Sequence, residues 1–391
     1  MAGISDDLLR VRDAHAHSRV TYVELFFDLV FVFAITQLSH TLLEHLTLAG
    51  LLQTTLLFMA VWWVWIYTSW VTNWLNPEHT SVRLLLFALM LAGLVLSTSI
   101  PQAFGSRGLA FAGAYVFMQV GRTFFMLWAL RGRNANNYRN FQRIVCWLLL
   151  SAMFWIWGGL AEGDARIVLW VIALAIEYIS PSVRFWTPGL GASTTSDWDV
   201  EGGHLSERCG LFIIIALGES VLVTGATFGK LAWTPAVVIA FSVAFIGSAA
   251  MWWIYFNIGA ERGSRQIAAS RDPGRLARLA YTYLHLLIVA GIIVVAVGDE
   301  LVLVHPDGHT DFKTAAVLIG GPALYLFGNL LFKRVSAVYY PLSHLVGLVL
   351  LALLLPAAAM ASPLALSAAT TLVLLVVAIW ETRSFRGTQP A

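Results

Sequence analysis

The stretch "YVELFFDLVFVFAITQLSH", residues 22–40, decides the fold class of this chain. Apart from Glu24 and Asp28 near its start, it consists mostly of residues that suit the hydrocarbon core of a bilayer. Its length approaches the roughly 20 residues that one helical crossing needs. Because comparable stretches recur along the whole sequence, we expect an all-α fold, a polytopic transmembrane helical bundle.

The composition supports a membrane protein and excludes several other classes. Of 391 residues, 59% are hydrophobic and 12% are charged, which is too apolar for a water-soluble globule of this length. A net charge of +2 without a basic run indicates no nucleic-acid partner. The two cysteines predict no disulfide framework or thiolate metal site, and no metal-ligand spacing or phosphate-binding loop suggests a cofactor. The partner expected from composition is the lipid bilayer, and self-association into a homo-oligomer is left open.

At roughly 20 apolar residues per crossing, the sequence predicts about twelve helices. They are expected near residues 21–42, 49–72, 82–102, 109–130, 142–161, 166–182, 209–229, 234–257, 277–298, 314–332, 339–360 and 363–382. The boundaries within the fifth and sixth helices, and within the last two, are the least defined because only a few residues separate each pair.

Lys and Arg alternate between loops as the positive-inside rule requires. One side holds only Arg107, Arg166, Lys230 and Lys313. The other side holds Arg10, Arg12, Arg19, Arg83, Arg131, Arg133, Arg139, Arg143, Arg184, Arg208, Arg262, Arg265, Arg271, Arg275, Arg278, Lys333, Arg334, Arg383 and Arg386. The pattern predicts a multi-pass protein of the cell inner (plasma) membrane with both termini in the cytoplasm.

The two halves of the sequence resemble each other in order. "ELFFDLVFVFAITQL" at Glu24 is echoed by "ERCGLFIIIALGESVL" at Glu207, and "AVWWVWIY" at Ala60 by "AAMWWIYF" at Ala249. An even number of helices per half returns the chain to the same side, which predicts two parallel six-helix repeats. The expected organisation is an N-terminal segment 1–20, repeats 21–186 and 207–384, a linker 187–206 and a tail 385–391.

Four carboxylates are candidate functional acids because a charge inside a membrane is costly unless it serves a function. Asp28 lies one helical turn beyond Glu24, and Glu219 lies three turns beyond Glu207. The simpler alternatives are that Glu24 and Asp28 favour the positive end of a helix dipole, and that a protonated Glu219 joins two helices. In the first half, Gln37 stands near the position that corresponds to Glu219.

Other polar residues inside predicted helices are candidate partners. Arg122 is too deep for a simple interfacial anchor, so we expect it to pair with Asp28 or Glu177. His40 and His285 are candidate proton-relay groups, although a lone intramembrane histidine is more often a packing residue. At the end of another predicted helix, Asp299 and Glu300 are expected to be solvated.

Tryptophans form a second kind of candidate site. Trp62 and Trp63 lie near the middle of a predicted helix, and Trp252 and Trp253 occupy the matching place in the second half. We expect these residues to line an interior that gates a pore or holds an apolar or cationic ligand.

Two segments of the sequence resemble the low temperature requirement A family of bacterial membrane proteins. They are "ELFFDLVFVFAITQLSH" and "HLSERCGLFIIIALGESVL". The matching positions are Glu24, Phe27, Asp28, His204, Glu207, Arg208, Gly218 and Glu219. The resemblance implies a fold and adds His204 and Arg208 to the candidate site, but it carries no settled activity. A weaker similarity joins "FFDLVFVFAIT" to potassium channels whose first helix begins Phe-Ser-Asp, with Phe27 here in place of the serine.

These features lead to a channel or transporter for a small cation or proton, with Asp28 and Glu219 along its path. The alternative is a membrane-embedded enzyme, for example an isoprenoid cyclase, in which one of these acids protonates an apolar small molecule in a Trp-lined cavity. A vestibule that reaches water would favour transport, and a cavity open only to lipid would favour the enzyme.

Overall fold

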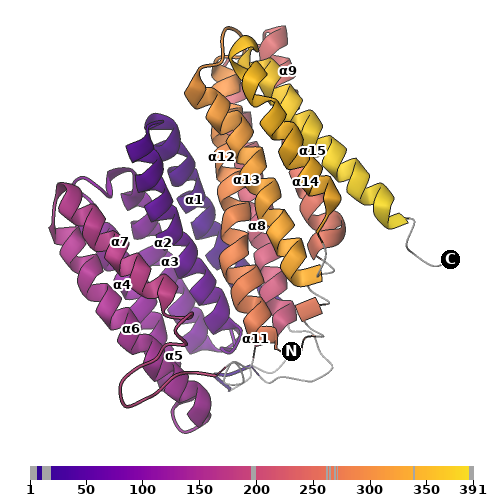
Figure 1. The fold of residues 1–391 in the computed structure, drawn as a ribbon. Helices are drawn as coiled ribbons and strands as arrows, with labels where there is room; N and C mark the ends of the chain where they lie inside the picture. Colours follow the sequence, from indigo (N-terminus) through magenta and orange to yellow (C-terminus); the bar gives the residue numbers. More distant parts are fainter. Residues whose placement is uncertain are drawn as a thin grey trace. The chain divides into compact units, whose positions relative to one another are not determined.

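The computed structural model describes residues 7–10, 19–194, 200–260, 263, 266–267, 270, 272–337 and 340–386. Within them the chain folds as α-helices joined by short loops, in two compact units (Figure 1). Unit 1 comprises residues 1–41, 47–205 and 271–275, and unit 2 comprises residues 42–46, 206–270 and 276–391. Parts of the expected N-terminal segment, linker and C-terminal tail lie outside the described residues, as do Arg12, Arg262, Arg265 and Arg271.

The helices of unit 1 follow one another with short connections, and the last three residues of α1 belong to unit 2. They are α1 (Tyr22–Glu44), α2 (Leu48–Thr72), α3 (Thr80–Ser99), α4 (Gly108–Val116), α5 (Arg122–Leu130), α6 (Ala135–Leu160) and α7 (Gly163–Ile179). A π-helical turn, η2 (Phe117–Gly121), joins α4 to α5, so these three elements form one continuous crossing. A short 3-10 turn, η1 (Ile100–Gln102), extends α3.

Unit 2 contains most of α8 (Gly202–Phe228) and the helices that follow it. The longer ones are α9 (Pro235–Ile254), α12 (His285–Val304), α13 (Phe312–Ala337), α14 (Leu342–Leu353) and α15 (Pro363–Arg386). Shorter segments connect them: η4 (Tyr255–Ala260), η5 (Ala277–Leu284) and η6 (Leu355–Met360). A further short helix, α11 (Pro273–Leu276), precedes η5, and all but its last residue belong to unit 1.

Ten of the helices in the described residues are long and apolar enough to cross a membrane. The all-α, multi-pass prediction is therefore confirmed, and ten of the twelve expected crossings correspond to these helices. The other two expected crossings correspond to shorter helices, α7 with 17 residues and α14 with 12. Pro181 follows α7, and Pro356 lies at the start of η6 directly after α14, where a residue without an N–H ends the helical ladder.

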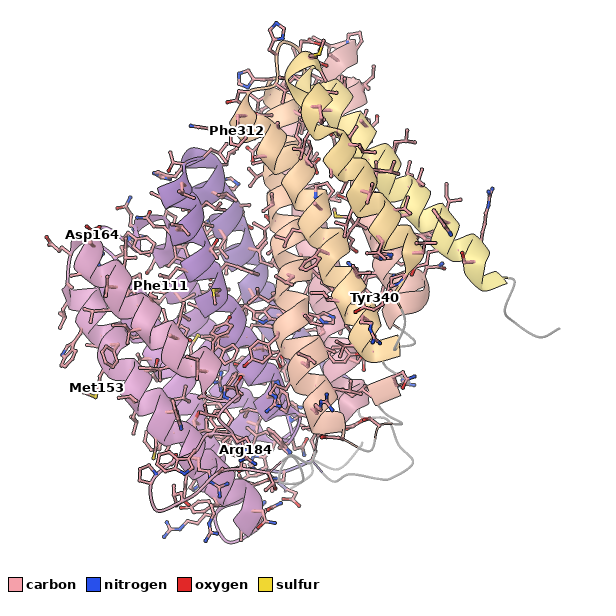
Figure 2. The ribbon with its side chains drawn as sticks, viewed as in Figure 1. Phe111, Met153, Asp164, Arg184, Phe312 and Tyr340 are labelled. Atoms are coloured by element: carbon pink, nitrogen blue, oxygen red, sulfur yellow. The ribbon has the colours of Figure 1, made fainter. Side chains whose placement is uncertain are left out.

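Aromatic packing forms the core of unit 1 between α4, α6 and α7. The rings of Trp155 and Trp170 lie 5.4 Å apart, Phe111 lies 5.4 Å from Trp170, and Tyr115 lies 4.4 Å from Trp155. Figure 2 shows Phe111 inside this bundle and Met153 at its outer edge, where the Met153 side chain is exposed. Each ring pair contributes roughly 0.5–1.5 kcal/mol beyond its buried area, so the three helices are held at a defined spacing.

Small residues bring α12 and α13 together along most of their length (Figure 1). A Cβ placed on Gly291 would lie 2.5 Å from the backbone nitrogen of Tyr325, and one on Gly321 would lie 2.9 Å from that of Val295. In a membrane, where lipid is as apolar as leucine, such close backbone approach is a main source of helix association.

Four basic residues that the sequence pattern assigns to loops are instead buried: Arg143, Arg166, Arg208 and Lys333. The Arg166 guanidinium donates to the carbonyls of Ala103, Gly105, Gly158 and Ala161, at 2.6–3.1 Å. It thereby satisfies acceptors at helix ends that would otherwise need water. Loop position along the sequence does not distinguish such a side chain from a solvated one.

Candidate functional site

Glu24 lies at the centre of a buried polar cluster in unit 1, which we call the Glu24 cluster: Arg10, Thr21, Glu24, Asn73 and His204. The Oε2 atom of Glu24 accepts hydrogen bonds from the Thr21 backbone N–H, the Thr21 hydroxyl and Arg10 Nη2, each at 2.9 Å. Thr21 directly precedes α1, so its pairing with Glu24 three residues later is one half of a capping box. On the other side, Glu24 Oε1 lies 3.0 Å from His204 Nε2.

Asn73 and Arg10 each place a hydrogen-bond donor beside a ring nitrogen of His204. The Asn73 amide accepts from the Glu201 N–H and donates to the Glu201 carbonyl, both at 2.9 Å, so its orientation is fixed. Its Nδ2 donor therefore faces His204 Nδ1 at 3.4 Å, which makes Nδ1 the acceptor. On the other side of the ring, His204 Nε2 lies 3.0 Å from Glu24 Oε1, which accepts, and 3.2 Å from Arg10 Nη2, which donates. The cluster holds one positive and one negative charge, on Arg10 and Glu24.

Asp28 lies one turn further along α1, about 6 Å deeper along the helix axis. Its side chain is fully buried, and the indole N–H of Trp65 on α2 donates to Oδ1 at 2.8 Å. Trp65 is itself fully buried, so the two helices present a carboxylate and its donor to each other inside unit 1.

Glu177 on α7 is the centre of a second buried cluster in unit 1, which we call the Glu177 cluster: Thr68, Tyr115, Gln119, Arg122, Ser151, Trp155 and Glu177. The carboxylate accepts from Tyr115 Oη at 2.6 Å, Gln119 Nε2 at 2.8 Å, Ser151 Oγ at 2.5 Å and Trp155 Nε1 at 3.0 Å. Four donors from two neighbouring helices leave its acceptor sites satisfied.

Arg122 joins the Glu177 cluster through an amide rather than by direct contact with the acid. Its Nη2 donates to Gln119 Oε1, and the other end of the same amide donates to Glu177. Arg122 Nη1 also donates to Thr68 Oγ1 at 2.7 Å and to the Val64 carbonyl at 3.1 Å. Of the two expected partners, Glu177 is the one that Arg122 reaches, through Gln119. The π-helical turn that carries Gln119 is a feature frequent at functional sites.

His285 in unit 2 is a fully buried neutral histidine. Its Nδ1 lies 2.9 Å from the Ala280 carbonyl, so Nδ1 carries the proton, and Nε2 accepts from Tyr255 Oη at 2.7 Å. The rings of Tyr281 and Phe332 pack on it at 5.0 and 4.6 Å. Both ring nitrogens are satisfied, which fits the packing role better than a relay.

The remaining candidates lie at separate points along α1 and α8. Glu219 and Arg208 are buried on α8, but eleven residues separate them, about 16 Å of helix. Glu207 and Gln37 are half-buried, and His40 is exposed.

The tryptophans differ between the two units. Trp62 and Trp63 are buried, and Trp63 stacks on Tyr178 with ring centroids 4.0 Å apart. Trp252 and Trp253 are 44% and 45% exposed, which corrects the expectation that they line an interior. The two Trp pairs lie in similar sequences, but the helices that pack against α2 and α9 determine which face of each is buried.

Sequence reasoning missed one group of ionisable residues in unit 2 and the burial of an acid there. Lys333, His344 and Glu381 meet in its interior, and Asp299, expected to be solvated, is buried with no hydrogen-bond partner for Oδ2 in the described residues. The available signal was a charge inside an apolar run, as in "LLFKRVS" and "AIWETRS". Nothing in those runs says which distant residues would meet.

Comparison with known proteins places these observations in a family. The model of the bacterial low temperature requirement A protein (LtrA) matches residues 19–379. The uncharacterized protein RA0937 of Rhizobium meliloti (strain 1021) is 44% identical over 367 residues, which covers 93% of this chain and 89% of the relative. No solved structure matches. The match spans the Glu24 cluster except Arg10, together with Asp28 and the whole Glu177 cluster.

Proposed function

The chain belongs to the bacterial low temperature requirement A (LtrA) family of multi-pass membrane proteins, and from this premise we propose that it conducts or transports a proton or a small cation. Intramembrane carboxylates provide the path, with Asp28 in unit 1 and Glu219 in unit 2 as its stations. No metal or organic cofactor takes part in this proposal.

The complete burial of the Asp28 carboxylate is the main support for this proposal. A fully buried carboxylate on a helix long enough to span the membrane is costly to keep, and such acids mark ion and proton pathways. Trp65 holds one oxygen of this carboxylate in a fixed position, so the group is oriented rather than merely tolerated. An oriented acid exchanges a proton or binds a cation at a defined point in the structure.

The Glu24 cluster supports the proposal from the adjacent turn of α1. Glu24 is neutralised by Arg10 and held by His204, so the charge next to Asp28 is compensated. We propose that the Glu24 cluster closes unit 1 on this side and opens when the hydrogen bond between Glu24 and His204 breaks.

Ion flux into liposomes tests the proposal directly. Purified protein is reconstituted, and flux is measured under K⁺, Na⁺ and pH gradients for the wild type, Asp28→Asn and Glu219→Gln. Asp28→Asn keeps an oxygen that can accept from Trp65 but removes the charge and the exchangeable proton, so we expect flux to be lost.

Two exposed acids provide matched controls for these substitutions. Asp164→Asn and Glu78→Gln make the same chemical changes at exposed positions and should leave flux unchanged. Absence of flux in the wild type under every gradient would overturn the proposal and favour the alternative of a membrane-embedded enzyme. Flux that persists in Asp28→Asn would remove Asp28 from the path.

We also propose that the two units are six-helix repeats, as the sequence pattern predicts. The support is that each unit contains a buried cation that donates to a carbonyl directly after a Trp pair. Arg122 donates to the Val64 carbonyl at 3.1 Å, and Lys333 donates to the Ile254 carbonyl at 2.9 Å. In each unit the linked acid lies on the last helix, as Glu177 on α7 and Glu381 on α15.

A further inference from the structure

Three ionisable side chains from three helices meet inside unit 2, and we call them the Glu381 cluster: Lys333 of α13, His344 of α14 and Glu381 of α15. Lys333 Nζ lies 2.6 and 2.8 Å from the two carboxylate oxygens of Glu381. It also lies 2.9 Å from the Ile254 carbonyl and 3.4 Å from His344 Nε2. All three side chains are buried, with exposures of 2%, 0% and 4%.

The chemistry of lysine determines how His344 is protonated. An ammonium group is a donor only, so His344 Nε2 must accept from Lys333 and carry no proton. The proton of a neutral His344 is then on Nδ1, which lies 3.2 Å from Ser343 Oγ. Hydrogen bonds therefore run in one unbroken series from Glu381 through Lys333 and His344 to Ser343.

The Glu177 cluster of unit 1 differs from the Glu381 cluster in its cation and in the groups that the cation contacts. There the cation is Arg122, which does not lose its proton in proteins, and a Gln119 amide separates it from Glu177. In unit 2 the cation is a lysine in direct contact with both the acid and a histidine. One arrangement can only hold charge in place, whereas the other can pass protons.

We propose that Lys333, His344 and Glu381 form a proton-exchange site. A proton from solvent binds the Glu381 carboxylate, which leaves Lys333 as a buried cation without its counter-ion. Lys333 then transfers one proton to His344 Nε2, and His344 releases its Nδ1 proton through the Ser343 hydroxyl. One proton enters and one leaves, no electron changes hands, and the cluster ends as neutral as it began.

The location of the cluster suits this exchange. Glu381 lies two residues before Arg383, which is exposed near the end of α15, so the buried acid is a short distance from the surface of the helix end. The exchange rests on the proposed function only for its use in transport, because proton uptake by Glu381 is measurable without any flux.

Other titratable and charged groups around the cluster are few. Tyr325 of α13 lies near enough to sense the charge of Glu381, and its hydroxyl donates to a carbonyl of α9 at 2.5 Å. Tyr255 at the end of α9 is already hydrogen-bonded to an imidazole. Arg334 stacks on an aromatic ring at 4.7 Å, and Arg383 is exposed. Among these groups, only the three cluster residues are joined in a continuous series.

Infrared difference spectroscopy on the full chain in liposomes tests the proposal. On acidification, the wild type should gain a carboxylic-acid C=O band that disappears in Glu381→Gln. Glu177→Gln is the matched control, because the cation of the Glu177 cluster does not release a proton, and this variant should keep the band. A band that is unaffected by Glu381→Gln would overturn the proposal.

A second variant guards against loss of folding. Lys333→Arg keeps the positive charge and the ion pair but cannot release a proton, so it should fold and lose the change of His344 from the Nδ1–H to the Nε2–H form. Nitrogen-15 NMR of labelled histidine reports this change, with the Nδ1–H form expected for wild-type His344 at neutral pH and the Nε2–H form after acidification. A Lys333→Arg protein that exchanges as the wild type does would overturn the proposal.

The two proposals fail separately. A Glu381 band and a His344 shift in a protein without flux would support the proton-exchange site and overturn the proposed transport function. If the wild type shows flux and Glu381→Gln leaves the band unchanged, only the proposed proton-exchange site is overturned.

Discussion

Trp65 is the residue that orients Asp28, and its indole N–H is the part that matters. Trp65→Phe keeps a buried aromatic ring but removes the donor that lies 2.8 Å from Oδ1. A buried acceptor that loses its donor costs roughly 1–3 kcal/mol. We expect the free energy of unfolding to fall by about that amount, together with reduced flux.

Trp128→Phe is the matched control for this substitution. Trp128 is 56% exposed on α5, so its loss should change the free energy of unfolding by less than about 0.5 kcal/mol. Denaturant unfolding of both variants in the same detergent makes the comparison. If the two curves coincide, the hydrogen bond from Trp65 to Asp28 does not contribute to stability.

Asp311 illustrates a smaller effect at the start of α13. Its Oδ1 accepts from the Thr314 N–H at 2.8 Å, and the hydrogen bonds from Thr314 lower the pKa of this carboxyl below its usual value. A lowered pKa means that the cap contributes stability at neutral pH and loses it as the pH falls through the folded-state pKa. Asp311→Ala should therefore cost about 0.5–2 kcal/mol at neutral pH and much less in acid.

Thermal unfolding of wild type and Asp311→Ala across a pH series checks this expectation. The difference between the two proteins should shrink as the pH falls. A difference that stays constant into acid would mean that the carboxylate charge plays no part in the cap.

Two adjacent glycines of α13, Gly320 and Gly321, distinguish the effect of helix packing on stability from the effect of helix propensity. A Cβ on Gly321 would lie 2.9 Å from both the backbone nitrogen and a side-chain methyl of Val295, whereas one on Gly320 would meet nothing within 4 Å. Gly321→Ala should destabilise the α12 and α13 pair by about 1–3 kcal/mol. Gly320→Ala should stabilise α13 by up to about 1 kcal/mol, the gain in helix propensity.

The opposite signs make this pair of variants a test of the contact between α12 and α13. Both change one hydrogen into a methyl group in the same helix, so expression and detergent effects are shared. Similar melting temperatures for the two proteins would show that α12 does not approach α13 as closely as the structure places it.

The whole molecule invites a test of its orientation in the membrane. We propose that both termini face the cytoplasm, from the asymmetry of Lys and Arg between alternate loops. Figure 2 shows Asp164 and Arg184 at opposite ends of unit 1, and in unit 2 it shows Phe312 at the start of α13 and Tyr340 well away from it, toward the other end of that helix. Each unit therefore separates its loops into two sets, as membrane spans must.

Cysteine labelling determines which set is outside. In a chain whose two cysteines are replaced by serine, Asp164→Cys should react with an impermeant maleimide added to intact cells, and Glu78→Cys should react only after lysis. Both positions are exposed in unit 1. Labelling of Glu78→Cys in intact cells would reverse the orientation.

Composition and hydropathy alone determined that this protein is an all-α, multi-pass membrane protein, and they located the apolar segments that form its ten long spans. The bilayer explains why. Every backbone polar group in hydrocarbon must be satisfied within its own helix, so a run of apolar residues of sufficient length has one stable structure. The helices α7 and α14 are shorter than their apolar segments because prolines follow them, and apolar composition continues past the point at which the hydrogen-bond ladder stops.

Only the tertiary structure decided which polar residues meet. Glu24 and His204 are 180 residues apart, and Lys333 and Glu381 are 48 apart. Partners at such separations depend on which helices pack together and which face each presents. The sequence identified Glu24, Asp28, Arg122 and Glu177 as unusual because a charge within an apolar run is visible along one chain. It could not reveal the Glu381 cluster, because a lysine near a helix end looks the same whether it is solvated or paired until the neighbouring helices are in place.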